Sequence, residues 1–354
     1  MESIEIVKQK RIRDGPMDLY ETRCFEGAVY TPEETNSEDN AEPEAEPETK
    51  PEAQEAAKPE EPDSEDDTED TCSEIKEDSL KDFYKRYVGR TAAQCLLEST
   101  APQRSLVWLE ARKYCITASN FGAAVGHNAY MSPEQLVGDK IWSCFKGNAY
   151  TAFGTFHESD ASRSLQKLLD TDLHDTLNKL WTPKGPWKWR LHEVGLLKWH
   201  KKPWMAVSPD GLLELYDSEG QSVWILVEYK CPARQRDSDS HPYARYNNNV
   251  PEYYMDQMQG VMGLLNEDPS LMPSSSTTSG AINGPQHALF VVWQKHQVHV
   301  TLVPFESKYY TTSLEPALRS WYFTKYLPRA YLKHTGSLVY GTLLAGSDIS
   351  VPNK

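Results

Sequence analysis

The sequence contains no run of about 18 consecutive apolar residues, so it offers no candidate for a membrane-spanning helix. Its first residues, MESIEIVKQKRIR, lack the apolar core of a secretory signal. The six cysteines form no C-x-x-C pair, which argues against a zinc ribbon, an iron–sulfur cluster and a disulfide framework. We therefore expect a soluble, intracellular protein whose cysteines are free thiols.

Basic and apolar residues are scarce in one part of the chain. Residues 31–79 contain 21 Asp and Glu but only three Lys, a net charge of −18, and Ile75 is their only large apolar residue. Such a segment cannot bury enough apolar surface to offset the entropy of ordering, so we expect a disordered, Pro/Glu-rich acidic linker. The whole chain carries −15, which leaves +3 on the remaining residues. The overall acidity therefore does not exclude a nucleic-acid partner.

The segments on either side of this linker differ from it. Residues 1–30 include a short basic run (Lys8, Lys10, Arg11 and Arg13) that could act as a nuclear-import signal, so a nuclear location stays open. From residue 80 the chain becomes rich in Trp, Tyr and Leu. We expect one packed domain over 80–345, with a flexible Ser-rich insertion at about 266–286, and a short tail at 346–354.

Apolar spacing within this domain predicts its secondary structure. Helices are expected at 105–115, 153–169, 251–265 and 313–326. Strands are expected at 191–199, 203–208, 211–216, 222–230, 288–294 and 297–305. This order of elements predicts an α/β domain with a mixed central sheet flanked by helices.

Two short motifs, SPDG at 208–211 and VEYK at 227–230, carry charged side chains to neighbouring strands. Residues i and i+2 of a strand share a face, so Glu228 and Lys230 project together, and a turn at Asp210 can aim its carboxylate at the same strand. Two carboxylates are ligands that Mg²⁺ prefers, and a lysine beside them can orient or deprotonate a water and stabilise charge on a phosphate. Each motif alone is commonly a plain turn or strand face. Here the charges end the apolar run WILV, where they are costly unless paired or used.

Together these motifs form the PD-(D/E)XK nuclease signature. Three further segments surround it in order: RKYCITASNFG at 112–122, FGTFHESDA at 153–161 and YYMDQMQGVM at 253–262. With them, residues 105–265 resemble the YqaJ-like viral recombinase family, which is similar to phage lambda exonuclease. The resemblance implies a restriction-endonuclease-like core and a Mg²⁺-dependent deoxyribonuclease, with Mn²⁺ as a substitute, that digests one strand of double-stranded DNA from a 5′-phosphorylated end.

The resemblance also implies roles for individual residues. Lys230 matches the catalytic lysine, and the metal ligands would be Glu158, Asp210, Glu228 and the main-chain carbonyl of Tyr229. The pocket for the terminal 5′ phosphate would be formed by Arg112, Ser119, Ser208 and Gln257. Guanidinium, hydroxyl and amide groups are suitable donors to a phosphate.

Plainer interpretations remain for several of these residues. Arg112 could belong to the polar face of a helix, Ser119 could cap the next one, and Gln259 competes with Gln257 for the pocket. His157 points about 100° away from Glu158 on a helix, so we expect it to support the site.

Five tryptophans between residues 181 and 204 alternate with basic residues. Contacts with DNA are expected from Lys198, Trp199, Lys201 and Lys202, because basic groups neutralise phosphates and aromatic rings stack on bases. The alternative is a set of amphipathic strands with Trp inside and Lys outside.

The resemblance implies double-stranded DNA ends and a single-strand annealing protein as partners. The acidic linker and the Ser-rich insertion are extra relative to the small phage enzyme, so its ring-shaped trimer is not carried over and the oligomeric state stays open. Two other functions are considered: a structure-specific endonuclease with the same core, and a catalytically silent DNA-binding module.

Overall fold

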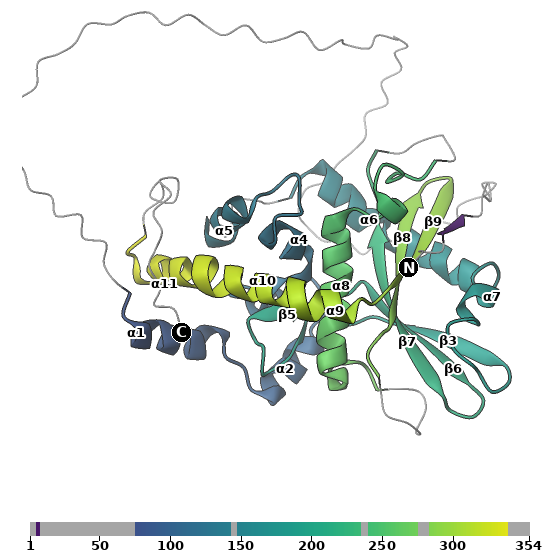
Figure 1. Cartoon of the computed structure of the whole chain (residues 1–354), viewed down its shortest axis with the longest axis horizontal. Helices are drawn as coiled ribbons and strands as arrows, with labels where there is room; N and C mark the ends of the chain where they lie inside the picture. The colour runs from purple at the N-terminus through teal and green to yellow at the C-terminus, as the bar shows by residue number, and fades with distance from the viewer. Residues whose placement is uncertain (1–4, 8–74, 143–146, 235–239, 275–282, 339–354) are drawn as a thin grey trace, which may run out of the picture. The chain divides into compact units, whose positions relative to one another are not determined.

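The computed structural model describes residues 5–7, 75–142, 147–234, 240–274 and 283–338. The basic run, nearly all of the expected linker, part of the Ser-rich insertion and the whole expected tail lie outside them. The described residues form an α/β fold in which helices flank a mixed six-stranded sheet, and a three-stranded sheet lies beside it (Figure 1). The predicted fold class is confirmed.

The large sheet has the strand order β1-β9-β8-β7-β6-β3. Its strands are β1 (Glu5–Val7), β3 (Trp187–His192), β6 (Gly211–Asp217), β7 (Ser222–Lys230), β8 (His287–Gln294) and β9 (Gln297–Pro304). β7 and β8 run parallel, and the other neighbours are antiparallel. A parallel pair needs a long crossover, and α8 (Glu252–Glu267) lies within that connection.

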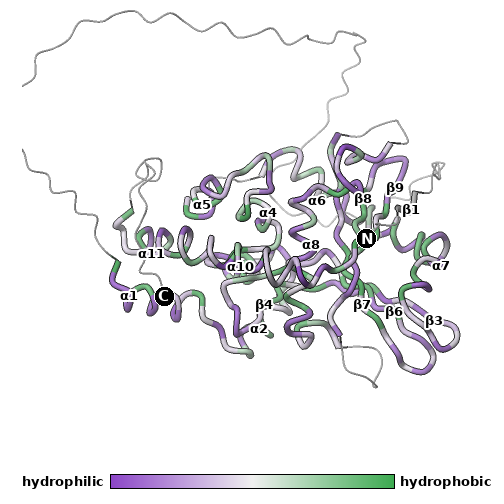
Figure 2. The backbone as a smooth tube through the Cα atoms, viewed as in Figure 1, coloured by the Kyte–Doolittle hydropathy of each residue, from purple (hydrophilic) through white to green (hydrophobic). Residues whose placement is uncertain are grey.

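Strand β7 lies between β8 and β6 in this sheet, and its residues from Trp224 to Tyr229 are buried. Figure 2 colours the backbone by hydropathy and labels β7 between its neighbours. The side chains of β7 alternate between two layers. Ile225 and Val227 pack with α6 (Ala149–Leu169) and α7 (His174–Leu177), whereas Trp224 and Leu226 pack with α8 and the C-terminal helices. The same alternation places Glu228 on the α8 side of the sheet and Tyr229 on the α6 side.

Helix α8 approaches its neighbours closely because it carries glycines. A Cβ at Gly260 would overlap the ring of Phe121 in α4 (Phe121–Ala124), and one at Gly263 would overlap the ring of Tyr310. Within α8, Asp256 to Leu265 are all buried. This close packing fixes α8, which carries Gln257, against its neighbouring helices.

Helix α6 starts with a capping box. The Asn148 side chain accepts from the backbone N–H of Thr151, and the Thr151 side chain bonds back to the N–H of Asn148. Ala161, Leu165 and Leu169 then form its buried stripe at helical spacing. This stripe sets the rotation of α6 and leaves Glu158 at the edge of the sheet.

Several predicted elements have other bounds in the structure. The helix expected at 105–115 ends at Ala111, and the one expected at 153–169 begins at Ala149. Two further differences are larger. The strand expected at 191–199 is divided: β3 ends at His192, and β4 (Leu197–Lys198) belongs to the small sheet with β2 (Ile116–Thr117) and β5 (Met205–Val207). Between them, Gly195 packs so closely on the end of α2 (Ala92–Ser99) that a Cβ would meet the carbonyl oxygens of Ser99 and Ala101 at 2.5 Å. The helix expected at 313–326 is part of a longer helical run at 307–335.

Some helices were not predicted from the sequence. They are α1 (Glu77–Phe83), α2 and α5 (Pro133–Trp142), together with the short α7. The remaining helices are α3 (Leu106–Ala111), α9 (Ser307–Tyr309), α10 (Glu315–Ser320) and α11 (Leu327–Thr335).

Candidate active site

Asp210 and Glu228 lie opposite each other at the ends of two paired strands. Gly211 pairs with Val227 in the antiparallel register of β6 and β7, so Asp210 comes next to Glu228 across the ladder. The Oδ2 atom of Asp210 accepts a hydrogen bond of 2.7 Å from the backbone N–H of Tyr229. The strand pairing itself therefore brings the two predicted acids together.

Glu228 is held by two side chains on its own face of the sheet. Its Oε1 atom accepts from Lys230 Nζ and from Gln257 Nε2, each at 2.5 Å. The Lys230 ammonium is also 3.5 Å from Gln257 Oε1. We call Asp210, Glu228, Lys230 and Gln257 the acid cluster. Gln257, predicted for the phosphate pocket, contacts the acids in this structure.

The acid cluster has more negative than positive charge in a buried place. Glu228 is only 1% exposed, and its Oε2 atom is buried without a hydrogen-bond partner among the described residues. Burial, followed by repulsion from Glu228, raises the pKa of Asp210 well above its usual value. Burial alone would lower the pKa of Lys230, but the Glu228 and Asp210 carboxylates outweigh it and raise that pKa. Lys230 is therefore an ammonium at neutral pH.

Glu158 reaches the same place from α6, on the other side of the sheet. It lines a cavity of about 1440 Å³ together with Asp210 and Tyr229. Both of its carboxylate oxygens lie 2.8 Å from Nη2 of Arg104, a residue that the sequence analysis did not single out. The backbone N–H of Tyr229 holds Asp210, and its carbonyl belongs to the same strand end.

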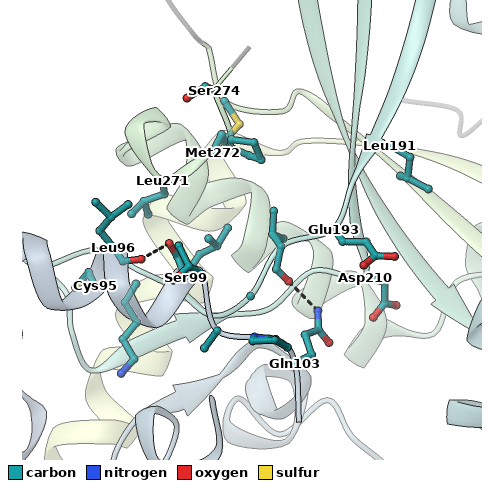
Figure 3. Close-up of a pocket in the computed structure, with 18 of the residues that line it drawn as sticks. Cys95, Leu96, Ser99, Gln103, Leu191, Glu193, Asp210, Leu271, Met272 and Ser274 are labelled. Carbon is teal, nitrogen blue, oxygen red and sulfur yellow. Dashed lines mark hydrogen bonds between the residues drawn. The ribbon is translucent and has the colours of Figure 1, made fainter. Parts of the chain in front are cut away.

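Figure 3 shows two more side chains in this cavity that the sequence analysis missed. Gln103 donates from Nε2 to the carbonyl oxygens of Val194 and Pro209, each at 3.1 Å, and so anchors the residue before Asp210. The carboxylate of Glu193 points into the same part of the cavity as that of Asp210 (Figure 3). Neither belongs to a motif, and only the folded chain brings them here.

The donor chemistry fits a divalent cation. The carboxylates of Glu158, Glu193 and Asp210 line the cavity. The Oε2 atom of Glu228 has no partner among the described residues. Hard oxygen donors of this kind are the ligands that Mg²⁺ prefers. Within the described ranges, however, no three His, Cys, Asp or Glu side chains converge closely enough to hold one ion as they stand. Glu158 is turned to Arg104 and Glu228 to Lys230, so binding would require their carboxylates to reorient.

Three residues predicted for the phosphate pocket meet around Trp108 and Thr117. The Arg112 guanidinium lies 3.8 Å from the centroid of the Trp108 ring and donates to Thr117 Oγ1 at 3.3 Å. Ser119 Oγ is 3.5 Å from that hydroxyl, and Ser208 Oγ accepts from Trp108 Nε1 at 3.2 Å. We call Trp108, Arg112, Thr117, Ser119 and Ser208 the arginine cluster. Trp108, four residues before Arg112, could have been found from helical spacing.

The arginine cluster contains a cation and neutral partners. Burial lowers the pKa of Arg112 to about 10, which still leaves it charged at neutral pH. Among the described residues, no carboxylate forms an ion pair with Arg112. A partly buried guanidinium whose contacts are a hydroxyl and an aromatic ring is suited to an anionic ligand.

One predicted DNA contact is wrong. Lys198 is fully buried, with its ammonium 2.8 Å from Glu98 Oε2 and 2.5 Å from the carbonyl oxygen of Ala111. It lies on β4, which packs against α2, so the helix covers a lysine that the alternation of basic residues and tryptophans had indicated for the surface. Its charge ties two parts of the core together.

The other predicted DNA contacts lie nearer the surface. Lys202 pairs with Glu267 at 2.6 Å and Glu315 at 3.1 Å, while Lys201 is exposed and lies 5.4 Å from the ring centroid of Trp199. Trp199 packs on the core as a half-buried ring.

The remaining tryptophans of this segment have structural partners. Trp204 is buried, Trp187 stacks on His174, and Trp189 donates to Asp170. The arrangement favours the amphipathic interpretation for these rings.

His157 supports α6 and lies outside the acid cluster. Its Nδ1 atom is 2.7 Å from Asp160 Oδ2, and its ring stacks on Trp293 of β8 with centroids 4.6 Å apart. This is the supporting role expected from its position on the helix.

Residues 107–266 match the YqaJ-like viral recombinase domain. The matched part of the chain is similar to the YqaJ-like viral recombinase family. It contains the acid cluster, the arginine cluster and Glu158, whereas Gln103 and Arg104 precede it. No curated protein matches the chain. Among the described helices, none combines the length and apolarity needed to cross a bilayer.

The match indicates a nuclease type that acts in recombination, with DNA as its class of substrate. The fold and both clusters are compatible with that activity.

Proposed function

We propose that this protein is a metal-dependent deoxyribonuclease that digests one strand of linear double-stranded DNA from a 5′-phosphorylated end. The observation that carries the proposal is the acid cluster, where Asp210 and Glu228 meet across a strand pair beside Lys230 and one Glu228 oxygen has no partner among the described residues. A buried, negatively charged site of this kind is stabilised by a cation.

Asp210, Glu228 and Glu158 would hold Mg²⁺, with Mn²⁺ as a substitute and the Tyr229 carbonyl as a further ligand. When bound, the ion would supply Lewis-acid stabilisation of the charge that develops on the scissile phosphate. Gln257 orients Glu228 by its hydrogen bond. The two carboxylates raise the pKa of Lys230, so its ammonium would act as a donor that orients the attacking water or a phosphate oxygen.

The arginine cluster would bind the terminal 5′ phosphate. Arg112 supplies the positive charge. Thr117 contacts both Arg112 and Ser119, and Trp108 contacts both Arg112 and Ser208, so the two serine hydroxyls lie near the guanidinium. Binding the end in this way would fix which strand enters the acid cluster. A protein that anneals the exposed single strand would act on the digested DNA. The basic run at residues 8–13 would direct the protein to the nucleus.

The test is a time course with the full chain on linear duplex DNA, in Mg²⁺ or in EDTA. Each strand is labelled in turn, and ends with a 5′ phosphate are compared with 5′-hydroxyl ends and with a closed circle. We expect Mg²⁺-dependent loss of the 5′-phosphorylated strand from its end. Cleavage of the circle at a similar rate would replace the exonuclease with an endonuclease, and no cleavage in any metal would favour a DNA-binding module.

A further inference from the structure

One ion pair occupies a carboxylate that the proposed metal site needs. Nη2 of Arg104 lies 2.8 Å from both Oε1 and Oε2 of Glu158, and 3.3 Å from Thr155 Oγ1 one turn earlier in α6. Both side chains are accessible, at 53% for Arg104 and 39% for Glu158. The pair therefore lies at the open side of the cavity, where it can separate without disturbing the core.

The backbone at Arg104 is held in an unusual conformation. Its φ is +68°, in the left-handed region that favours glycine. The residues on either side are anchored: Gln103 bonds to the carbonyls of Val194 and Pro209, and Ser105 accepts from Trp108 N–H at the start of α3. These anchors keep the backbone in place and direct the side chain of Arg104 into the cavity.

The three carboxylates do not converge in this structure, and the Arg104 pair holds one of them. Asp210 and Glu228 are brought together by strand pairing, but Glu158 faces the guanidinium, and no described group of three acids surrounds a common point. Arg104 also lies before residues 107–266, so it is a feature of this chain outside the matched domain.

We propose that Arg104 is a displaceable counter-ion. It neutralises Glu158 while the metal is absent, leaves Glu158 when a divalent cation binds, and then contacts a phosphate of the DNA strand in the same cavity. This inference rests on the proposed metal site. A guanidinium released from a carboxylate has the geometry to fork onto phosphate oxygens, and its place beside the acids keeps it within the substrate's reach.

The first test measures metal affinity without DNA. Mn²⁺ is titrated by calorimetry into the full chain and into Arg104→Ala and Arg104→Gln, with unchanged melting curves as evidence of folding. Both variants should bind Mn²⁺ about fivefold more tightly, because the ion no longer competes with a half-exposed ion pair. The matched control is Arg163→Ala, which removes the guanidinium that pairs with Asp160 two residues further along α6 and should leave the affinity unchanged.

The second test measures binding of a short 5′-phosphorylated duplex by fluorescence anisotropy, with Ca²⁺ in place of Mg²⁺ and again in EDTA. Arg104→Ala should weaken binding about fivefold in Ca²⁺ and leave it nearly unchanged in EDTA, where the guanidinium stays on Glu158. Arg104→Lys should recover part of the affinity. An equal loss in both conditions would show an ordinary phosphate contact and overturn the displacement.

The outcomes separate this inference from the proposed function. If the wild-type chain binds Mn²⁺ and both Arg104 variants bind it with the same affinity, Arg104 is not a counter-ion and only this inference fails. If the wild-type chain and the variants all fail to bind Mn²⁺, the metal site itself is wrong and both proposals fail.

Discussion

The acid cluster and the arginine cluster are incomplete in opposite ways. In the acid cluster, Asp210 and Glu228 share one ammonium, and the buried Oε2 atom of Glu228 is left without a partner within the described ranges. In the arginine cluster, Arg112 has a ring and a hydroxyl as partners, and no described carboxylate. One region lacks positive charge, and the other lacks negative charge.

This difference distinguishes charges that serve the fold from charges that serve ligand binding. Charges that served only the fold would be expected to pair with each other, as Lys198 does with Glu98 in the core. Acids and a guanidinium that are kept apart, each short of opposite charge, lower the stability of the fold. Such an arrangement is typical of sites that a ligand completes. The two clusters together therefore fit a substrate that brings a cation to one and an anion to the other.

The strongest way to break the comparison is to remove a charge from the acid cluster. We expect Asp210→Ala and Lys230→Ala to lower the rate of DNA digestion at least about 100-fold, because each removes a group that contacts the ion or the scissile phosphate. The rate is measured on 5′-phosphorylated duplex in Mg²⁺. Asp175→Ala, at an exposed site on α7, is the matched control. Full activity in Asp210→Ala or Lys230→Ala would show that the active site lies elsewhere in the chain.

A smaller effect is expected in the arginine cluster. Arg112→Lys keeps the charge but loses the planar fork and part of the stacking on Trp108. The preference for 5′-phosphorylated over 5′-hydroxyl ends should fall about tenfold, the size of one charge-assisted hydrogen bond. The ratio of the two digestion rates measures this. A uniform slowing at both kinds of end would instead assign Arg112 to the fold.

The smallest effect concerns stability. The pKa of Asp210 is raised above its usual 3.8, so the folded chain binds this proton more tightly than the unfolded chain does. The free energy of unfolding therefore falls as the pH rises from about 3.8 through the raised pKa. Asp210→Asn should therefore raise the melting temperature in EDTA at pH 7.5 by about 2 °C, with less gain at pH 5. Mg²⁺ should stabilise the wild type and not this variant. A lower melting temperature for Asp210→Asn would show that the hydrogen bond from Tyr229 outweighs the repulsion.

The parts of the site that strands carry could be predicted from the sequence. Alternation along β7 puts Glu228 and Lys230 on one face, and the hairpin brings Asp210 to them, because strand geometry is local and regular. The strands at 211–216, 222–230 and 288–294 agree with the structure to within one residue at each end for the same reason.

What depended on contacts between distant segments could not be predicted. The burial of Lys198 depends on α2, the division of the strand expected at 191–199 follows from Gly195 packing on Ser99 and Ala101, and Arg104 reaches Glu158 across 54 residues. The position of Gln257 beside Glu228 depends on how α8 packs between the sheet and its neighbouring helices, and Gly260 permits the close contact with Phe121 of α4.

The segment from Gln103 to Arg112 joins the two clusters through a single stretch of chain. Gln103 holds the carbonyl before Asp210, and Trp108 contacts both Ser208 and Arg112. A shift of this segment on binding at one cluster would change the affinity of the other, and thermodynamic linkage requires the same factor in both directions. The factor by which metal changes the affinity for a phosphorylated end would then equal the factor by which that end changes the affinity for metal.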